Sequence, residues 1–476
     1  MSPDTVPSPK KPDPNSLAHS IPPGFVIGTA TAAAQIEGAS TAAGRSVWDD
    51  FSAQPGRIID GSDTSVTCDH YSRYAEDVAL MSTLGADAYR FSFAWPRLQP
   101  SGLGALDPAG IDFYDRMLDE LAEHAISPFA TLYHWDTPAE LEAGWLDRDT
   151  ALRFGEFASL VGERFADRVD AWITLNEPAT VTLNGYALGI HAPGETLLFD
   201  ALPTVHHQLL GHGLAVQALR AASVPGRIGI TNVHSPVRAA TDSPEDAAMA
   251  QLFDIVHNRV FADPVLLGSY PDVPDELAPL FGALGGADSR DLDTICQPLD
   301  FYGLNYYMPT RVAAGAGTGA SPDGTAEAMT GLPFHLVDID EYPRTGFGWP
   351  IAPKHLGTAL AEMRDRYGAA LPPVYITENG ASFADEVAPN GTINDPERIA
   401  YLDAHLRAAF DAVAPGGAAD GVDLRGYFAW SLLDNWEWAA GFTQRFGLVH
   451  VDFDTLERTP KASFEWLRQV LAARQR

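Results

Sequence analysis

The chain has 476 residues, of which 46% are hydrophobic, so it can bury a large core as one elaborated domain or as two or three smaller ones. Its 31 basic and 63 acidic residues give a formal net charge of −32 at pH 7. A charge of this sign and size repels nucleic acid and anionic membrane surfaces, so we expect neither as a partner and instead expect a small neutral ligand.

The first 20 residues are rich in Pro, Ser and Asp and contain no apolar segment. They predict a disordered tail (1–20) that is neither a signal peptide nor a membrane anchor. No apolar run of 18 residues follows.

The two cysteines, Cys68 and Cys296, cannot form a disulfide framework or a zinc cluster, and we expect free thiols. These features predict a cytoplasmic protein.

Strands and helices alternate along the rest of the chain. Short apolar runs bounded by Gly or Pro predict strands, and longer segments with apolar residues at helical spacing predict helices. The predicted strands are 25–33, 87–95, 128–136, 171–175, 227–234, 299–307, 374–377 and 424–432. The predicted helices are 71–84, 111–124, 150–165, 205–222, 244–260, 353–367, 395–413 and 462–472. Segment 313–348 is predicted to be a long connection.

Eight strand–helix units without a composition break predict an α/β fold, a single (β/α)8 TIM barrel with elaborated βα loops over residues 21–476. A doubly wound sheet is the alternative. We favour the barrel because polar or aromatic residues follow nearly every strand, and a closed ring brings all the strand exits to one mouth. The Gly-rich dinucleotide fingerprint and the phosphate-loop motif are both absent, which removes the usual chemistry of the alternative.

Two glutamates, Glu177 and Glu378, each come at the end of an apolar strand, in the strings Leu-Asn-Glu-Pro and Ile-Thr-Glu-Asn-Gly. Considered alone, each is more often an ion-paired or capping residue. Together, at two strand exits of one barrel, they can face each other across a pocket. Hydrolysis of a glycosidic bond needs such a pair, with one carboxylate at the anomeric carbon and one carboxylic acid that protonates the departing oxygen.

With these strings, the N-terminal Phe-Val-Ile-Gly-Thr-Ala-Thr-Ala-Ala-Ala-Gln-Ile-Glu-Gly and the run from Trp430 to Trp438, the chain resembles a β-glucosidase of glycoside hydrolase family 1 over about residues 21–471. The resemblance implies a retaining mechanism with Glu177 as acid/base and Glu378 as nucleophile. Glutamates on the fourth and seventh strands of the ring face each other, and a separation of about 5 to 5.5 Å leaves no room for a water molecule between carboxylate and sugar.

The environments of the two glutamates can be predicted as well. We expect Arg90 and Tyr307 to support an ionised Glu378 through a neighbouring positive charge and a hydrogen bond. We expect the charge of Glu378 and a partly apolar wall to keep Glu177 protonated near neutral pH.

The resemblance also implies a sugar site. Residues matching those that hold the sugar hydroxyls, with Trp430 as the floor, are Gln35, His134, Trp135, Asn176, Glu437 and Trp438. Taken alone, His134 is more often a core or loop histidine. Asn176 is expected to bond the sugar 2-hydroxyl, and Trp349 resembles a platform for the sugar beyond the cleaved bond. The remaining candidates for substrate binding are Asn305, Tyr307 and Phe446.

We therefore predict hydrolysis of terminal β-D-glucosyl residues from cellobiose and aryl glucosides, with side activity on β-galactosides and β-fucosides because Glu437 can bridge two hydroxyls. No His, Cys, Asp or Glu cluster has metal-ligand spacing, so no cofactor is expected. The sequence leaves open whether identical chains form a homo-oligomer. Ala179 stands where the family often has Trp, which leaves the preference for the leaving group open.

Several rival functions would require other residues at these positions, and one would not. A phosphoglycosidase would carry a Ser and a Lys after the eighth strand, where this chain has Asp434 and Glu437. A plant-type thioglucosidase replaces the acid glutamate by Gln, and a non-catalytic sugar-binding protein would lose one carboxylate. Both glutamates are intact here. A transglycosylase shares every catalytic residue and remains the alternative.

Overall fold

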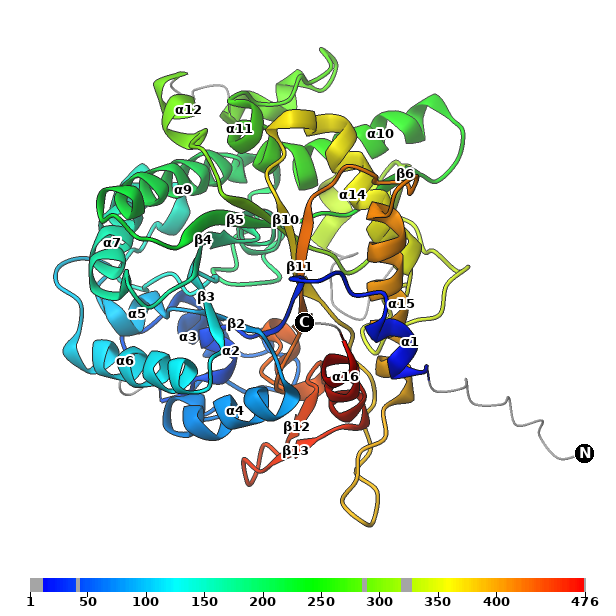
Figure 1. The fold of residues 1–476 in the computed structure, drawn as a ribbon. Coiled ribbons are helices and arrows are strands. Elements are labelled where there is room, and N and C mark those ends of the chain that lie inside the picture. The colour runs from blue at the N-terminus through cyan, green and yellow to red at the C-terminus, as the bar shows by residue number, and fades with distance from the viewer. Residues whose placement is uncertain (1–11, 40–42, 285–288, 318–327, 475–476) are drawn as a thin grey trace, which may run out of the picture.

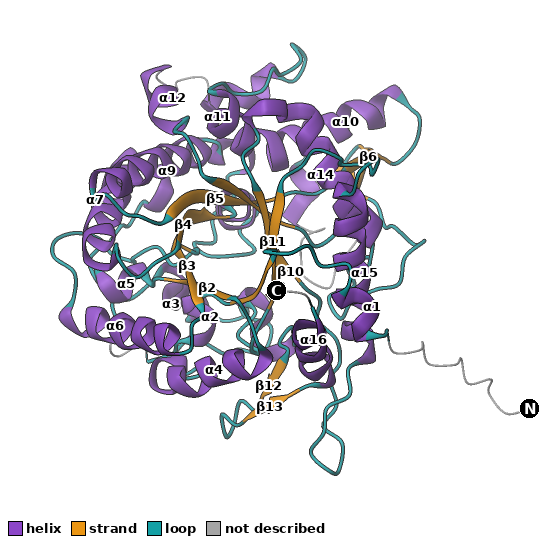
Figure 2. Cartoon of the chain, viewed as in Figure 1, coloured by secondary structure: helices purple, strands orange, loops and turns teal. Residues whose placement is uncertain are grey.

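The computed structural model describes residues 12–39, 43–284, 289–317 and 328–474. A closed barrel of eight parallel strands lies at its centre, surrounded by a ring of helices (Figures 1 and 2). In order around the barrel, the strands are β1 (Val26–Ala30), β2 (Ala88–Ser92), β3 (Ser127–Tyr133), β4 (Ala171–Asn176), β5 (Arg227–Val233), β7 (Phe301–Asn305), β10 (Val374–Asn379) and β11 (Leu424–Trp430).

The ring closes between its first and last strands. β1 pairs in parallel with β11, from Val26 opposite Gly426 to Ala30 opposite Trp430, and with β2 on its other side. In a doubly wound open sheet the two edge strands would each lack one neighbour. The predicted (β/α)8 barrel is therefore confirmed, and the doubly wound alternative is excluded.

Helices follow each barrel strand and pack around the outside. The longer ones are α4 (His70–Leu84), α6 (Pro108–Glu123), α7 (Arg148–Phe165), α9 (Pro203–Ala221), α10 (Pro244–Asp254), α11 (Val260–Leu267), α14 (Pro353–Tyr367), α15 (Pro396–Val413) and α16 (Ala462–Ala473). The short α-helices are α1 (Pro14–Ala18), α2 (Ala33–Ile36), α3 (Val47–Ser52), α5 (Trp95–Leu98), α8 (Pro178–Thr180) and α12 (Ser289–Ile295).

Among the described residues, two segments are π-helical, η3 (Val181–Ala187) and η5 (Ile255–Arg259). The 3-10 turns are η2 (Gly144–Leu146), η4 (Leu198–Ala201), η6 (Ala278–Leu284), η7 (Met329–Gly331), η8 (Gly368–Ala370) and η9 (Trp438–Thr443). Segment 244–260, predicted as a single helix, thus divides into α10 and η5 and runs on into α11. A π-helical turn inside a helix often marks a functional site.

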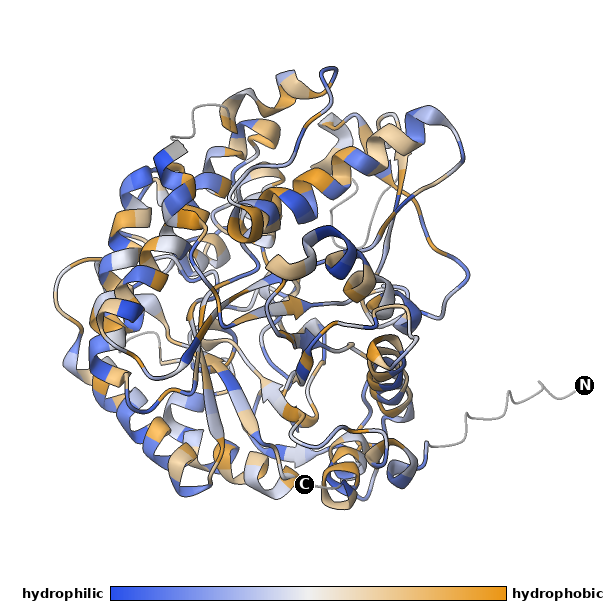
Figure 3. Ribbon diagram, turned by 45° about the horizontal axis from the view of Figure 1, so that its top comes forward, coloured by the Kyte–Doolittle hydropathy of each residue, from blue (hydrophilic) through white to orange (hydrophobic). Residues whose placement is uncertain are grey.

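Local sequence accounts for the helix ends. The Asp107 carboxylate accepts hydrogen bonds from the N–H groups of Ala109 and Gly110 at 2.9 and 3.2 Å, with Pro108 at the first helical position of α6. Pro lacks the N–H that this position would leave unpaired. Along the outer helices hydrophobic and hydrophilic residues alternate (Figure 3), as expected when one side of each helix packs on the barrel and the other contacts water.

The connection predicted over 313–348 contains secondary structure that its sequence did not reveal. A three-stranded sheet joins β6 (Val237–Ala239), β8 (Thr310–Ala314) and β9 (Phe334–Leu336), while residues 318–327 lie outside the described residues. Strands of three to five residues are too short for a clear alternating pattern. A further hairpin of β12 (Val449–Val451) and β13 (Arg458–Pro460) lies near α16.

The N-terminal segment differs in part from the expected disordered tail. Residues 14–18 form α1, Leu17 and Ala18 are buried, and α1 contacts α16. The side chain of Asp13 caps this helix, and apolar burial of Leu17 offsets the cost of ordering it. Residues 1–11 lie outside the described residues, and the domain boundaries remain a prediction. Within the described ranges, no helix is long and apolar enough to cross a membrane.

A buried ion cluster fixes the chain that follows β11. The Lys461 ammonium, 1% exposed, donates hydrogen bonds to Asp385 and to Asp434, both at 2.6 Å. Arg445 contacts the other oxygen of Asp434 at 2.8 Å, and Arg398 pairs with Asp385. Two arginines and one lysine thus neutralise carboxylates that have no access to water. A buried pair of this kind is costly to break, because the remaining partner stays buried and unpaired.

We predict that Lys461→Met lowers the free energy of unfolding by about 3 kcal/mol, since it leaves two buried carboxylates without one of their cations. Urea unfolding followed by tryptophan fluorescence measures the loss. The matched control is Lys354→Met on the exposed face of α14, which should leave unfolding unchanged. Equal stability of the two variants would mean that the cluster contributes nothing through Lys461.

Candidate active site

Both glutamates singled out by the sequence lie at the mouth of the barrel. Glu378 is near the carboxyl end of β10, whose pairing with β7 changes register between Ile376 and Glu378. Glu177 directly follows β4, whose pairing with β5 changes register between Ile173 and Asn176. Glu177 also has left-handed backbone angles, φ 45° and ψ 62°. Such irregularities redirect side chains next to active sites, and a left-handed residue other than Gly is strained.

The carboxylate of Glu378 is held at both oxygens. Arg90, fully buried on β2, forms an ion pair with Oε1 and donates to the Thr377 carbonyl at 3.1 Å. The Tyr307 hydroxyl donates to Oε2 at 2.7 Å. Burial, followed by the charge of Glu378, holds the pKa of Tyr307 well above its usual value, so the phenol keeps the proton that it donates. The structure thus brings both predicted supporting groups to Glu378.

Glu177 has a different environment. The Asn305 amide donates to its Oε1 at 2.6 Å, and the Thr180 hydroxyl donates to its Oε2 at 2.7 Å. Burial, and then the negative charge of Glu378, raise the pKa of Glu177 to about 7, while the two hydrogen bonds act in the opposite direction. A carboxyl group with this pKa can give up and take back a proton near neutral pH.

A buried hydrogen-bond network determines the tautomer of His134. Arg90 and Asn305 both donate to Oδ1 of Asn176, at 2.6 and 3.1 Å. The Asn176 amide nitrogen therefore faces Nε2 of His134 at 3.0 Å and donates to it, which places the imidazole proton on Nδ1. Burial and the charge of Arg90 keep the pKa of His134 well below its usual value, so the ring is neutral.

Among the buried polar atoms at this end of the site that have no hydrogen-bond partner within the described residues, two can reach a ligand hydroxyl. The Nδ1–H of His134 is one, and the Oε1 of Gln35 is the other. The Gln35 amide nitrogen is already bonded to Asn435 Oδ1 at 3.0 Å and to the Trp436 carbonyl at 2.9 Å. A buried donor or acceptor that lacks a hydrogen-bond partner costs free energy. These two atoms can be satisfied by a ligand hydroxyl, which both donates and accepts.

Glu437 adds a third carboxyl group to the same region. The Gln35 amide nitrogen lies 3.3 Å from its Oε2. Burial and the charge of Glu378 raise the pKa of Glu437 to about 8. A carboxyl group that is neutral at pH 7 can donate to one sugar hydroxyl and accept from another.

Aromatic rings form the walls. Trp430 and Trp438 lie near the His134 ring with centroid separations of 6.0 and 5.9 Å, and Trp135 lies 4.5 Å from Trp438. Trp135 and Trp438 have positive φ angles of 77° and 53°. Elsewhere on the wall, Trp349 stacks on Phe347 at 4.7 Å, and Phe446 lies 6.1 Å from Trp349. Indole faces of this kind bind the apolar face of a sugar.

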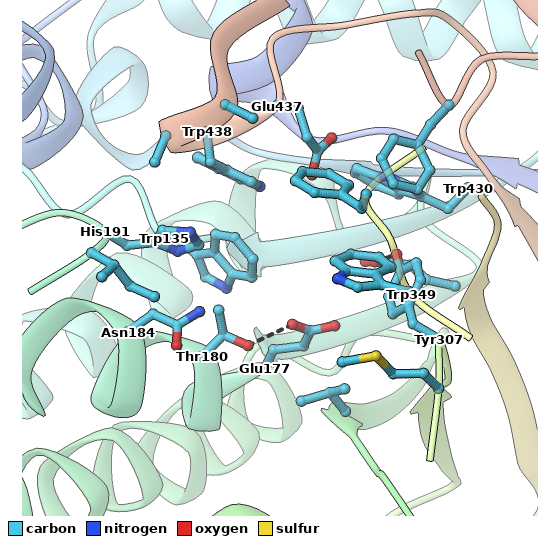
Figure 4. Close-up of a pocket in the computed structure, with 18 of the residues that line it drawn as sticks. Trp135, Glu177, Thr180, Asn184, His191, Tyr307, Trp349, Trp430, Glu437 and Trp438 are labelled. Atoms are coloured by element: carbon cyan, nitrogen blue, oxygen red, sulfur yellow. Dashed lines mark hydrogen bonds between the residues drawn. The ribbon is translucent and has the colours of Figure 1, made fainter. Parts of the chain in front are cut away.

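These residues surround a cavity of about 520 Å³ (Figure 4), a volume typical of sites for small ligands. Glu177 lies on one side of the cavity and Glu437 on the opposite side. The predicted site residues that line it are His134, Trp135, Glu177, Tyr307, Trp349, Glu378, Trp430, Glu437, Trp438 and Phe446. The other predicted residues, Gln35, Arg90, Asn176 and Asn305, are fully buried and contact this set through the hydrogen bonds described above.

Sequence reasoning missed part of the wall. Thr180 and Asn184 line the cavity beside Glu177, from α8 and η3, whereas Ala179 is 1% exposed and does not line it. The wall beside Glu177 is therefore formed by Thr180 and Asn184 and not by position 179. Thr180 and Asn184 follow Glu177 by three and seven positions, the spacing of one helix face. That spacing was the available signal.

The described residues include no group of three or more His, Cys, Asp or Glu placed to hold a metal ion. Residues 17–476 match the family model described as glycosyl hydrolase family 1. The chain belongs to this family. The resemblance drawn from the sequence is confirmed, the protein is a glycoside hydrolase, and the retaining mechanism expected above is general to family 1.

Relatives of this family-1 enzyme cover nearly its whole length. A thermostable β-glucosidase B from Thermobispora bispora is 45% identical over 95% of this chain and 90% of its own. A bifunctional β-D-glucosidase/β-D-fucosidase from Bifidobacterium breve is 40% identical over 95% and 98%. The crystal structure of a psychrophilic β-glucosidase from Micrococcus antarcticus superposes with a TM-score of 0.89 at 42% identity, covering 97% of this chain and 99% of that one.

The charge of Glu378 predicts a measurable coupling in this family-1 site. Glu378→Gln should lower the pKa of Glu177 from about 7, because the like charge that raises it is removed. The pKa should stay above that of an exposed glutamate, since burial remains the larger cause. A ¹³C NMR titration of labelled glutamates measures it, with Glu177→Gln assigning the signal. An unchanged titration in Glu378→Gln would mean that the two carboxyl groups are not coupled.

Proposed function

We propose that this family-1 enzyme is a retaining β-glucosidase that hydrolyses terminal non-reducing β-D-glucosyl residues of cellobiose and aryl β-glucosides. The observation that carries the proposal is the contrast between the two glutamates of one cavity. Glu378 forms an ion pair with Arg90, whereas burial and the charge of Glu378 raise the pKa of Glu177 to about 7. One carboxylate is equipped to attack and one carboxylic acid to donate a proton.

In the first step, an oxygen of Glu378 attacks the anomeric carbon of the bound glucosyl unit. The bond between this carbon and the glycosidic oxygen breaks, and Glu177 gives its proton to that oxygen, so the aglycone leaves as a neutral alcohol. Arg90 and Tyr307 hold the attacking carboxylate in place. The product is a glucosyl ester of Glu378 and an ionised Glu177.

In the second step, a water molecule replaces the aglycone. With Glu378 esterified, its negative charge is gone, and the repulsion that had opposed ionisation of Glu177 is gone with it. Glu177 takes a proton from the water, whose oxygen attacks the anomeric carbon and breaks the ester bond. Two inversions give net retention, and both carboxyl groups return to their starting states.

We propose that the buried, unpartnered polar atoms hold the glucosyl unit. Nδ1–H of His134 donates to a hydroxyl, Oε1 of Gln35 accepts from one, and Glu437 binds two neighbouring hydroxyls. Asn176 has one amide hydrogen beyond the one directed at His134, and we assign that hydrogen to the 2-hydroxyl. Trp430 lies under the ring, and Trp349 contacts the leaving group.

The substrate range follows from these contacts. The bifunctional name of the Bifidobacterium breve relative supports side activity on β-fucosides, and we extend the proposal to β-galactosides because Glu437 can bind either orientation of a hydroxyl.

Arg57 is the one Arg or Lys among the described lining residues, and it donates to the Gly189 carbonyl at 3.0 Å. Lys461, next to Asp434, is buried in the ion cluster. Neither arrangement supports a phosphorylated sugar as the preferred substrate. Location in the cytoplasm remains a prediction.

The proposal predicts an order of specificity constants. The specificity constant for nitrophenyl β-glucoside should exceed those for the β-galactoside and the β-fucoside. The constant for the 6-phosphoglucoside should be the lowest, because Arg57, the one Arg or Lys among the described lining residues, is already bonded to the Gly189 carbonyl. Proton NMR of the first-formed glucose should show the β-anomer. A preference for the phosphorylated sugar or a first-formed α-anomer would contradict the proposal. Products at high cellobiose concentration distinguish a hydrolase from a transglycosylase, which would transfer glucose to a second sugar.

We predict that Glu378→Gly loses at least about 10⁴-fold in kcat while the fold stays intact, because the covalent step is removed. Azide should restore turnover and yield the α-glucosyl azide, since a small anion can occupy the space of the missing carboxylate. Glu386→Gly, the same change at an exposed glutamate, is the control and should remain active. Full activity of Glu378→Gly without azide would refute the assignment of the nucleophile.

A further inference from the structure

The side chain of Thr180 is bonded to the proposed acid/base. Its hydroxyl lies 2.7 Å from Oε2 of Glu177 (Figure 4). Thr180 is the last residue of α8, the short helix that begins immediately after Glu177, and it lines the cavity. The other oxygen of Glu177 is bonded to Asn305. Neither carboxyl oxygen therefore lacks a partner within the protein.

Within the described residues, the hydroxyl of Thr180 makes no hydrogen bond that joins one helix to another. Thr182, two residues later, shows the contrast. Its buried hydroxyl is hydrogen-bonded to the Thr204 hydroxyl at 2.8 Å and to the Gln208 amide at 2.9 Å. The hydroxyl of Thr180 has Glu177 as its hydrogen-bond partner within the described residues. Its contact thus concerns the carboxyl group rather than the packing of helices.

The two partners of Glu177 differ chemically. The N–H of Asn305 can only donate, so it always favours an oxygen that accepts. A hydroxyl can donate to a carboxylate and can accept from a carboxylic acid. In the proposed reaction Glu177 alternates between these forms. Thr180 can follow the change by rotating its O–H bond, without movement of a heavy atom.

We propose that Thr180 is a positioning residue that stabilises the ionised form of Glu177 and thereby balances its two roles, acid in glycosylation and base in deglycosylation. This inference rests on the proposed function. A hydrogen bond from Thr180 favours the carboxylate, in opposition to burial and to the charge of Glu378. Other elements also present charged or titratable groups to Glu177 or its cavity. These groups are Arg57 after α3, Arg90 from β2, His257 from η5, Tyr307 after β7, Glu378 from β10, Glu437 after β11, and His134 and His191 from the loops after β3 and η3.

The sign of the effect is the same in both steps. Removing the donor makes ionisation of Glu177 harder, so its pKa rises in the free enzyme and in the glucosyl-enzyme. The free enzyme then keeps its acid to higher pH, and the basic limb of kcat/KM moves up. The glucosyl-enzyme needs a higher pH to form its base, and the acidic limb of deglycosylation moves up as well. A defect in packing would lower rates without moving both limbs in one direction.

The test compares Thr180→Val, which has nearly the same shape, with Thr180→Ser, which keeps the hydroxyl. For Thr180→Val we expect the basic limb of kcat/KM on cellobiose to rise by about one pH unit, the shift that loss of one hydrogen bond to a charged group gives. With dinitrophenyl β-glucoside, whose leaving group needs no proton, the burst should persist. On the acidic limb the steady-state rate should fall by up to about 10-fold, the largest change that a shift of one pH unit gives, and it should recover at higher pH.

Thr180→Ser should restore both limbs. If Thr180→Val does not fold, Thr180→Ala removes the same donor with less bulk and replaces it in every measurement. The proposal would be overturned if the valine or alanine variant had the same pH profiles of kcat/KM and deglycosylation as the wild type. It would also be overturned if Thr180→Ser had the same profiles as Thr180→Val.

A titration without turnover separates this inference from the proposed function. In the ¹³C spectrum of the resting enzyme, the pKa of Glu177 should lie higher in Thr180→Val than in the wild type and Thr180→Ser. If the wild type cleaved no β-glucoside, the proposed function would fail while this titration still tested the hydrogen bond. If β-glucosides were cleaved and the titration did not move, the inference alone would fail.

Discussion

Three carboxyl groups share the buried end of one cavity, and Arg90 is bonded to only one of them. Burial penalises each charge, and each ionised carboxylate makes the ionisation of the next one harder. The Arg90 guanidinium pairs with Glu378. Burial and the charge of Glu378 then make ionisation of the other two groups unfavourable, and their pKa values rise to about 7 for Glu177 and about 8 for Glu437. The position of one arginine thus separates a paired carboxylate from two carboxylic acids. The acid/base role and the sugar contacts proposed above both depend on this separation.

The backbone around the cavity is shaped for this arrangement at some cost in stability. Trp135, Glu177 and Trp438 have positive φ angles, and a left-handed residue other than Gly costs about 1 to 3 kcal/mol. The strands that carry Glu177 and Glu378 lose regular register just before these residues. Such strain persists only where the surrounding structure enforces it. The fully buried strands β4 and β10 and the ion cluster of Lys461 supply that rigidity.

Contacts from separate elements also decide what each oxygen of Glu177 bonds. Asn305 comes from β7 and pairs with Glu378 in the sheet register, while its amide crosses to Glu177. Thr180 comes from the turn that Glu177 itself begins. One partner thus depends on the closure of the barrel, and the other only on local structure. The local partner is the easier of the two to change without disturbing the barrel.

The alternation of eight apolar strands with helices was sufficient to predict the barrel, because strands buried on both sides and helices with one apolar face are local patterns. It failed for β6, β8 and β9, which are too short to show a period and are stabilised by one another. Residues 14–18 were expected in a disordered tail, because the contacts between α1 and α16 join opposite ends of the chain and leave no local signal.

The same division holds for the site. The sequence by itself determined that Glu177 and Glu378 end two strands, because an apolar run followed by a carboxylate is visible in a few neighbouring residues. Only the tertiary structure decided that the Asn305 amide bonds Glu177, that His134 carries its proton on Nδ1, and that Thr180 rather than Ala179 faces the cavity. Hydrogen-bond partners, tautomers and side-chain direction depend on atoms within a few ångströms of one another. Those atoms come from strands and loops that only the closed barrel brings together.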